Sequence, residues 1–533
     1  MARGAWQDAS DAFESGLDSE RRAEALEGLG WAVYWLDDLR RSMKLREQAF
    51  RAYRDADRQR DAGRVATGLG VDASDTDGEA VCMGWLGLAH RCLDELPPCA
   101  EQGWLYLWDG QLARMFRGDV ERARSLGGEA AKLGRSLGIA DLELLGSALE
   151  GLILVNEGQI DQGMRRLDTS TAAALIGDMT DLYSVTQTCC FLLHACEWVR
   201  DYDRMAQWTE RVDAFAGDRN ISSAFTPCRT QHAAMLIAQG RWEEAETQLQ
   251  SVNEQLVMTR PWLAVESIEQ LGELRRRQGR FDESEALFER AGARTVALLG
   301  RAHMALERQA ADEALELGER ALRSLSDARW GDRAIGQHVM VRGHLANGDA
   351  DGAQQAIEAL RETAAAMGTA HATALLHHAQ GLMVAAEQPD DAKAHMSDAL
   401  KAFEDARAPH EAALTRVALC EILIGSGRAS AATAELDAAI AALAELGAER
   451  DAESARALRA GIGAAATVED SSLSPREQQV LRLVADGLTD RAISAKLGIS
   501  EHTVHRHISN ILNKLDRPSR ASAVAYALRK HLI

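Results

Sequence analysis

A short pattern of polar and apolar residues recurs along most of the chain. A polar turn is followed by an opening residue, usually apolar or small, and then by a stretch with apolar positions every three or four residues. The opening residues are Val120, Ile160, Tyr202, Trp242, Phe281, Ala311, Ala350, Pro389 and Ala429, at intervals of 40, 42, 40, 39, 30, 39, 39 and 40. Apolar positions at this spacing predict amphipathic helices, and a step of about 40 residues predicts stacked helical hairpins.

Small residues in the same pattern predict that neighbouring helices pack closely. Three positions after the opening residue stand Ala123, Gly163, Ala245, Ser284, Ala314, Ala353, Ala392 and Ala432. Met205 departs from this rule, and the step of 30 between Phe281 and Ala311 predicts one shortened unit. Because a single hairpin is too small to bury its own apolar face, the hairpins must stack into a solenoid.

The repeats resemble tetratricopeptide-type repeats, in a long variant, over roughly residues 20–460. The segment 31–39 lies about two periods before Val120, and the sequence does not place the unit between them. The resemblance implies an all-α superhelix whose concave surface senses or docks a protein, peptide or small-molecule partner.

Two kinds of residue cluster in this array are candidate ligand sites. They are the tryptophan pairs Trp31/Trp35 and Trp104/Trp108, and the group Cys190, His194 and Cys196. The tryptophans of each pair share a helix face, which favours packing between hairpins over an aromatic ligand cage. Cys196 lies about 120° around the helix from His194 and no fourth ligand completes a tetrahedron, so buried packing is favoured over zinc.

Residues 461–472 separate the array from a small C-terminal region. Their sequence, GIGAAATVEDSS, loses helical periodicity and predicts a linker. The chain is therefore predicted to consist of a repeat domain at 1–460, this linker, and a second domain at 473–533.

Four short helices are predicted in residues 473–533. They follow the capping residues Ser474, Thr489, Ser500 and Ser519, and the last helix runs to about Arg529. Ser474, Pro475 and Glu477 form a capping box with proline at the first helical position. The second helix, Asp490 to Leu497, is followed by Gly498 and then by the third helix. Two short helices joined by a tight turn that contains glycine describe a helix-turn-helix.

The third of these helices has one apolar face and one polar face. The apolar stripe, which predicts the side toward the core, consists of Val504, Ile508, Ile511, Leu512 and Leu515. The opposite side carries His502, Arg506, Ser509, Asn510 and Asn513, while His505 and His507 flank the stripe about 160° apart. Histidines that diverge around a helix cannot converge on one ion, so no metal site is predicted. The polar face is rich in hydrogen-bond donors, which suits a helix that enters the major groove of DNA.

Residues 473–528 resemble the LuxR-type helix-turn-helix domain almost from end to end. The resemblance is carried by LSPRE, VLRLVADGL, ISEHTV with the histidine and the IL-x-KL pattern that follow, and SRA. It implies a bacterial DNA-binding regulator that takes double-stranded DNA as its partner. It also implies a homodimer that forms through the last helix, Ser519 to Arg529, and reads an inverted repeat.

The resemblance further implies roles for individual residues of the third helix. The positions that align with base-contacting residues are His505, Arg506 and Ser509, with Arg506 as the candidate for a bidentate contact to guanine. The positions beside the phosphate backbone, or in support of the helix, are Thr503, His507 and Lys514, and the outer face is completed by His502, Asn510 and Asn513.

Two positions depart from the family's usual pattern. The family usually has lysine where His505 stands, and Asn-Lys where Asp490 and Arg491 stand. Because imidazole changes its charge within the physiological pH range, a contact through His505 depends on pH. Asp490 can cap its helix, but it would repel a phosphate.

Charge, cysteines and hydropathy limit the compartment in which the protein works. The net charge is −21, yet residues 468–533 hold ten lysines and arginines against seven acids, which leaves −24 on the remainder. This small positive balance is only weak support for DNA binding. We expect a cytoplasmic protein without membrane contact, because no signal peptide or membrane-length apolar stretch is found. The eight cysteines show no repeated spacing, so we expect thiols that are mostly buried.

The sequence predicts neither an enzyme nor a bound cofactor. It contains no Gly-Lys dipeptide, which a phosphate-binding P-loop requires, and neither HExxH nor a paired CxxC. We expect a bacterial transcriptional regulator whose helical array receives a partner. The alternative is a protein-interaction scaffold in which the C-terminal domain only tethers or dimerises.

Overall fold

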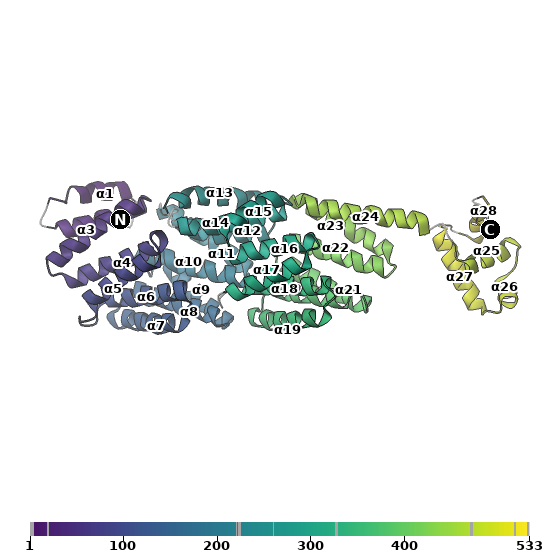
Figure 1. Ribbon diagram of the computed structural model, residues 1–533, viewed down its shortest axis with the longest axis horizontal. Coiled ribbons are helices and arrows are strands. Elements are labelled where there is room, and N and C mark those ends of the chain that lie inside the picture. Colours follow the sequence, from purple (N-terminus) through teal and green to yellow (C-terminus); the bar gives the residue numbers. More distant parts are fainter. Residues whose placement is uncertain are drawn as a thin grey trace.

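The computed structural model describes residues 5–18, 21–219, 221, 225–259, 261–325, 329–469, 473–515, 517, 519–529 and 532. No strand occurs among these residues, so the predicted all-α fold is confirmed. Figure 1 shows a long array, from α1 (Trp6–Glu14) to α24 (Glu449–Glu469), and a small group from α25 (Pro475–Ala485) to α28 (Arg520–Arg529).

The odd-numbered helices form one layer of the array. They are α3 (Leu39–Asp55), α5 (Glu79–Leu93), α7 (Val120–Leu137), α9 (Ile160–Ile176), α11 (Tyr202–Arg219), α13 (Trp242–Thr259), α15 (Phe281–Ala291), α17 (Ala311–Ser324), α19 (Ala350–Met367), α21 (Pro389–Asp405) and α23 (Ala429–Leu446). From α7 onward, each of them begins at an opening residue of the sequence pattern. The predicted repeat register is therefore confirmed over nine helices.

The even-numbered helices form the second layer. They are α2 (Arg22–Trp35), α4 (Gln59–Thr76), α6 (Ala100–Arg117), α8 (Ala140–Asn156), α10 (Leu182–Val199), α12 (Thr226–Ala238), α14 (Pro261–Arg277), α16 (Thr295–Glu307), α18 (Trp330–Ala346), α20 (Ala370–Val384) and α22 (Pro409–Gly425). Each packs on the odd-numbered helix that follows it, so the described residues form eleven hairpins. Most even-numbered helices also contact the even-numbered helices before and after them, as expected for a tetratricopeptide-like solenoid.

The small residues of the pattern lie where helices approach most closely. Ala123, Ala245 and Ala353 each have no exposed surface. A Cβ atom added to Gly163 in α9 would lie 2.5 Å from the carbonyl oxygen of Gly151 in α8. A larger side chain would force these two helices apart, which explains why small residues recur at this position.

The N-terminal part of the array continues the same period. α3 begins at Leu39 and α5 begins at Glu79, 40 residues later, so the unit that the sequence left unplaced is α4 with α5. The shortened unit consists of α15 with 11 residues and α16 with 13, which accounts for the step of 30.

The array coils so that helices four hairpins apart meet. α2 reaches α10 through the rings of Trp31 and Tyr183, whose centroids lie 6.0 Å apart. α10 reaches α18 through Arg200, at its C-terminal cap, which donates a hydrogen bond to Asp332. α14 reaches α22 through Arg277, which pairs with a carboxylate of α22 at 2.7 Å. Successive turns of the superhelix therefore touch one another.

The tryptophan pairs pack inside the array. Trp35 stacks on Trp6 of α1, with centroids 5.2 Å apart. Trp108 is 7% exposed and its ring lies 5.7 Å from that of Tyr183. Trp104 is partly buried against the same core. These contacts agree with the predicted packing between hairpins.

The loss of helical structure predicted for residues 461–472 is wrong over most of this stretch. α24 continues without interruption to Glu469, and residues 470–472 lie outside the described part. Alanine has the highest helix propensity, and each glycine costs only about 1 kcal/mol, so the alanine run 464–466 keeps this stretch helical despite Gly461 and Gly463.

The expectation that all cysteines are thiols is wrong for two of them. Cys190 and Cys228 form a disulfide, whereas the other six, Cys82, Cys92, Cys99, Cys189, Cys196 and Cys420, are free and buried. The two bonded residues are 38 positions apart, close to one repeat period. They lie on α10 and α12, which are adjacent in space, and the bond spans the contact between these two helices.

Among the described residues, no helix combines the length and the apolar character that crossing a lipid bilayer requires.

Candidate nucleic-acid interface

A separate hydrophobic core holds the four C-terminal helices together as one module, residues 473–529. Its helices are α25, α26 (Asp490–Leu497), α27 (Glu501–Lys514) and α28. The buried residues include Val480, Leu481, Ile493, Val504, Ile508, Ile511, Leu515, Ala523 and Ala527. The predicted apolar stripe of α27 thus faces the core, with Leu512 partly buried at its edge.

Local capping sets where each helix of this module begins. The backbone N–H of Glu477 donates to Ser474 Oγ at 3.2 Å, and the N–H of Ser474 donates to Glu477 Oε2 at 2.8 Å, so the capping box is confirmed. The N–H of Thr503 donates to Ser500 Oγ at 3.1 Å, which fixes the start of α27. Between α26 and α27, Gly498 has φ +65°, a left-handed conformation that glycine adopts without strain.

The polar face of α27 is open to solvent, as its sequence predicts. His502, His505, Arg506 and Asn510 are exposed, and Thr503, His507, Ser509 and Lys514 are partly exposed. The side chain of Asn513 lies outside the described part of the structure. Arg506 makes no hydrogen bond or ion pair with any other described residue, so its guanidinium donors remain available to a ligand.

The three histidines of α27 point in different directions. His505 has 68% of its side chain exposed, whereas His507 is partly buried. No group of three or more potential metal ligands occurs within the described residues, either here or around Cys190 and His194.

Lys514 supports the helix in this structure. Its Nζ donates to Glu477 Oε2 at 2.7 Å and ties the end of α27 to the start of α25. Burial raises the cost of ionising Glu477, but the hydrogen bonds from Lys514 and Ser474 outweigh it and lower the pKa of this carboxyl below its ordinary value.

Asp490 has a partner that the sequence did not reveal. Its carboxylate accepts hydrogen bonds from Arg520 Nη1 at 2.6 Å and Nη2 at 2.8 Å. Nδ1 of His505 lies 4.0 Å from the same carboxylate. The negative charge at the start of α26 is thus paired beside a residue expected to read bases. No local spacing signals this contact, because Arg520 follows Asp490 by 30 residues.

One match to an enzyme motif lacks the setting that the motif needs. Residues 134–138, GRSLG, fit the pattern GxSxG. They lie at the end of α7, and Ser136 Oγ donates to the carbonyl oxygen of Leu133. A nucleophile elbow requires a sharp turn from a strand into a helix, so this serine is not in catalytic geometry.

Taken together, the module presents a capped helix with one buried face and one donor-rich face. Residues 471–527 match the family described as bacterial regulatory proteins, luxR family. The chain carries a LuxR-type helix-turn-helix domain. The LuxR-type domain is the part of the chain that curated relatives share. It is similar to the transcriptional regulatory protein LiaR of Bacillus subtilis, with 47% identity over 62 residues, which is 12% of this chain and 29% of LiaR.

A second relative is the nitrate/nitrite response regulator protein homolog of Haemophilus influenzae. It is 52% identical over 52 residues, which is 10% of this chain and 25% of that protein. The chain therefore spans less than a third of the length of these curated relatives, and the likeness is confined to the LuxR-type domain.

Solved structures of helical repeat proteins align with the array at low similarity. The Cut9–Hcn1 hetero-tetramer of the APC/C aligns with a TM-score of 0.44 and 14% identity, over 82% of this chain and 84% of that one. A Rap protein complexed with competence and sporulation factor aligns with a TM-score of 0.37 and 11% identity, over 78% and 98%.

Proposed function

We propose that the protein is a bacterial transcriptional regulator that binds double-stranded DNA through the exposed face of α27. The observation that carries this proposal is the open, donor-rich face of α27 within a domain that matches the luxR family. A buried stripe fixes the orientation of the helix, and the opposite face is left for the major groove, whose base edges offer acceptors to arginine and histidine.

We assign base reading to His505, Arg506 and Ser509. Arg506 is the candidate for a bidentate contact to guanine, because it is exposed and its donors are not taken up by described neighbours. The residues assigned to the outer face or to phosphates are His502, Thr503, His507, Asn510 and Asn513. Lys514 supports α27 through Glu477 and can still approach a phosphate, since 40% of its side chain is exposed.

The regulator acts as a dimer through α28 in this proposal. Three exposed residues, Ala521, Ala525 and Leu528, lie at i, i+4 and i+7 and form an apolar strip on that helix. Leu528 is the largest of the three side chains and has 55% of its surface exposed. Two such strips in contact would place two recognition helices on an inverted repeat.

The array serves as the receiver of a protein or peptide partner in this proposal, and the whole protein works in the cytoplasm, where bacterial DNA is found. Hairpin solenoids expose long surfaces that suit such partners. We assign no catalytic activity and no cofactor to the chain. The alternative remains an interaction scaffold, which would leave the exposed face of α27 without a role.

The proposal is tested by selecting bound duplexes from a random library with the full-length protein. We expect enrichment of an inverted repeat. Arg506→Ala should lose base preference at one position in each half-site. There, the binding free energy that separates the preferred base from the others should fall by about 1–3 kcal/mol. Arg482→Ala, which removes an exposed arginine from α25, is the matched control and should keep the preference. Failure of the full-length protein to enrich any duplex would refute the proposal.

Genome-wide crosslinking separates the regulator from the scaffold. Discrete promoter peaks that disappear in Arg506→Ala support the regulator. A scaffold predicts no such peaks, and it predicts that removal of residues 473–533 leaves partner binding to the array unchanged.

A further inference from the structure

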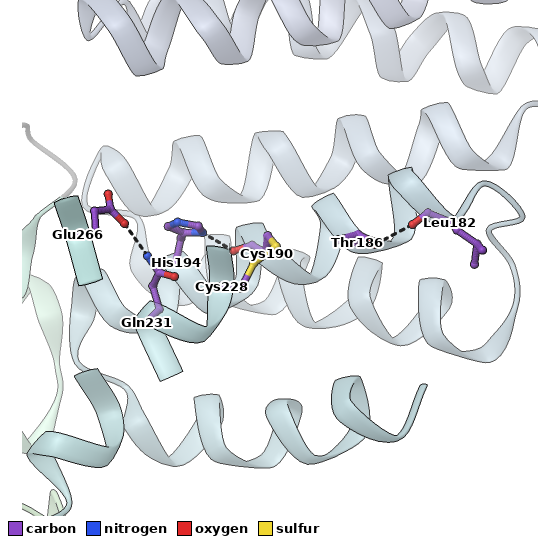
Figure 2. The surroundings of a disulfide bond; sticks show 7 residues. All are labelled: Leu182, Thr186, Cys190, His194, Cys228, Gln231 and Glu266. Carbon is purple, nitrogen blue, oxygen red and sulfur yellow. Dashed lines mark hydrogen bonds between the residues drawn. A yellow bond between two sulfur atoms is a disulfide. The ribbon is translucent and has the colours of Figure 1, made fainter. Parts of the chain in front are cut away.

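Two consecutive even-numbered helices of the array are joined by a covalent bond. Figure 2 shows Cys190 of α10 linked to Cys228 of α12. Their Cα atoms lie 5.8 Å apart. The bond is almost fully enclosed, because Cys190 is 7% exposed and Cys228 is 2% exposed. Beside the bond, His194 donates from Nδ1 to the carbonyl oxygen of Cys190 at 2.8 Å. The described residues around it form no group of three or more potential metal ligands.

The proposed function places this disulfide in an unusual compartment. A protein that binds bacterial DNA works where thiols are kept reduced, and disulfides found there are usually transient and redox-responsive. The reasoning about the compartment rests on the proposed DNA binding. The position of the two cysteines does not, since it follows from the packing of α10 against α12.

We propose that Cys190 and Cys228 form a reversible oxidation site, oxidised by hydrogen peroxide and reduced by dithiols. In the first step the sulfur of Cys190 attacks one oxygen of the peroxide. The O–O bond breaks, the thiol proton leaves with the departing hydroxide as water, and Cys190 becomes a sulfenic acid. The sulfur of Cys228 then attacks the sulfenic sulfur, the S–S bond forms, and a second water leaves. Two thiols are oxidised and one peroxide is reduced to two waters.

Neighbouring thiols are poor competitors in this reaction. Cys189 is adjacent to Cys190 on α10, and burial raises the pKa of its thiol to about 12. Burial likewise raises the pKa of Cys196 well above its ordinary value. Because the thiolate is the reactive form, a raised pKa slows the reaction of these two thiols with peroxide at neutral pH. Cys190 is the more exposed residue of the pair, at 7% against 2% for Cys228, and is therefore the one that a small oxidant reaches first.

The disulfide lies where it can restrain the movement of α10 relative to α12. α10 is held to the preceding superhelical turn by Tyr183 and to the following turn by Arg200, and Cys190 lies between them. α12 is held to α14 by Gln231, whose Nε2 donates to Glu266 Oε2 at 3.1 Å. The disulfide therefore clamps α10 to α12 in the middle of the coil. Reduction removes this clamp and lets the two helices open more often.

Alkylation of the full-length protein, followed by peptide mass spectrometry, tests the site. After reduction with dithiothreitol, all eight cysteines should be alkylated in denaturant. After peroxide treatment of the folded protein, six should be alkylated, with Cys190 and Cys228 in one linked peptide. Dithiothreitol added under native conditions should restore eight. Hydrogen exchange of α10 and α12 should be slower in the oxidised form than in the reduced form.

Two variants make the outcome decisive. Cys228→Ser should form no linked peptide, and its hydrogen exchange should not respond to peroxide. Cys189→Ser is the matched control on the same helix and should still form the Cys190–Cys228 link. Eight alkylated cysteines after peroxide treatment would overturn the proposal. So would a link that native dithiothreitol cannot break, a link between other cysteines, or hydrogen exchange that is identical in the two forms. DNA binding of the same samples is scored separately, so its loss counts against the proposed function alone.

Discussion

The carboxylate of Asp490 is held by both terminal nitrogens of Arg520, at 2.6 and 2.8 Å. This bidentate pair joins the N-terminus of α26 to the N-terminus of α28, 4.0 Å from the ring of His505. An acidic residue here would repel the DNA backbone if it stood alone. Pairing with arginine neutralises it, so the departure from the family pattern at position 490 is compensated within the module.

Arg520→Gln should therefore weaken binding to every duplex rather than alter sequence preference. The unpaired carboxylate of Asp490 would face the phosphates, and because the pair is partly exposed we expect only about a two- to fivefold loss. The loss should shrink as salt rises. The double variant Asp490→Asn with Arg520→Gln should recover most of the affinity in fluorescence anisotropy titrations. No recovery would show that Arg520 contacts DNA itself.

Leu528→Glu should convert the proposed dimer into a monomer. The substitution puts a charge into the apolar strip on α28, and charges are depleted from the cores of such interfaces. Loss of the second half-site contact should lower affinity for an inverted repeat by on the order of 10²-fold. Sedimentation velocity measures the first effect and anisotropy the second. Leu137→Glu, at an exposed leucine of α7, is the control and should change neither.

Glu477→Gln should destabilise the C-terminal module at neutral pH. It weakens the hydrogen bond from Lys514 to a buried carboxylate, which is worth about 1–3 kcal/mol. The folded-state pKa of Glu477 is lowered, so the wild-type advantage is full above the ordinary glutamate pKa and is lost as pH falls through the folded value. Denaturant unfolding of residues 473–533 at pH 7 and at pH 3 measures this. If the difference in stability between the wild type and Glu477→Gln does not change with pH, the ion pair of Glu477 with Lys514 does not cause it.

Two histidines meet inside the array and should make its stability fall in mild acid. Nε2 of His338 lies 2.9 Å from Nδ1 of His378. Burial lowers the pKa of both imidazoles, that of His378 to about 3. At pH values above the ordinary histidine pKa, both rings are neutral in the folded and in the unfolded chain, so they do not lower the free energy of unfolding. Below about 6.5 the unfolded chain takes up protons that the folded array refuses, so stability drops, by about 2 kcal/mol per histidine at pH 5.

The variant His378→Gln should flatten this dependence. Chemical unfolding of the array at pH 7.5, 6.0 and 5.0 should show a smaller loss than in the wild type. Leu137→Gln, at an exposed position of α7, adds and removes no titratable group and should leave the wild-type slope unchanged. If all three proteins lose stability in parallel, the buried pair is not the source.

The fold was largely predictable because its determinants are local and periodic. The start of α7 or α23 depends on a turn, one opening residue and a small residue three places on, all of which lie in a short window. The same holds for the capping box at Ser474 and the cap at Ser500, which set the helices of the LuxR-type domain. The buried and exposed faces of α27 follow from its helical period alone.

What the sequence did not reveal depends on contacts between distant positions. The disulfide between Cys190 and Cys228 and the pair of Asp490 with Arg520 join residues 38 and 30 positions apart. Only the superposition of repeats, or of helices within the module, brings them together. The persistence of α24 to Glu469 was missed for another reason, since glycine weakens a helix without ending it.

Contacts between helices four hairpins apart also change how the array unfolds. In an open solenoid each unit depends only on its immediate neighbours, so the ends fray independently of the middle. Here α10 is braced by both α2 and α18, and loss of either terminal segment withdraws support from the centre. The array is therefore expected to melt as a cooperative body, and to fold slowly, because chain segments about 150 residues apart must find each other first.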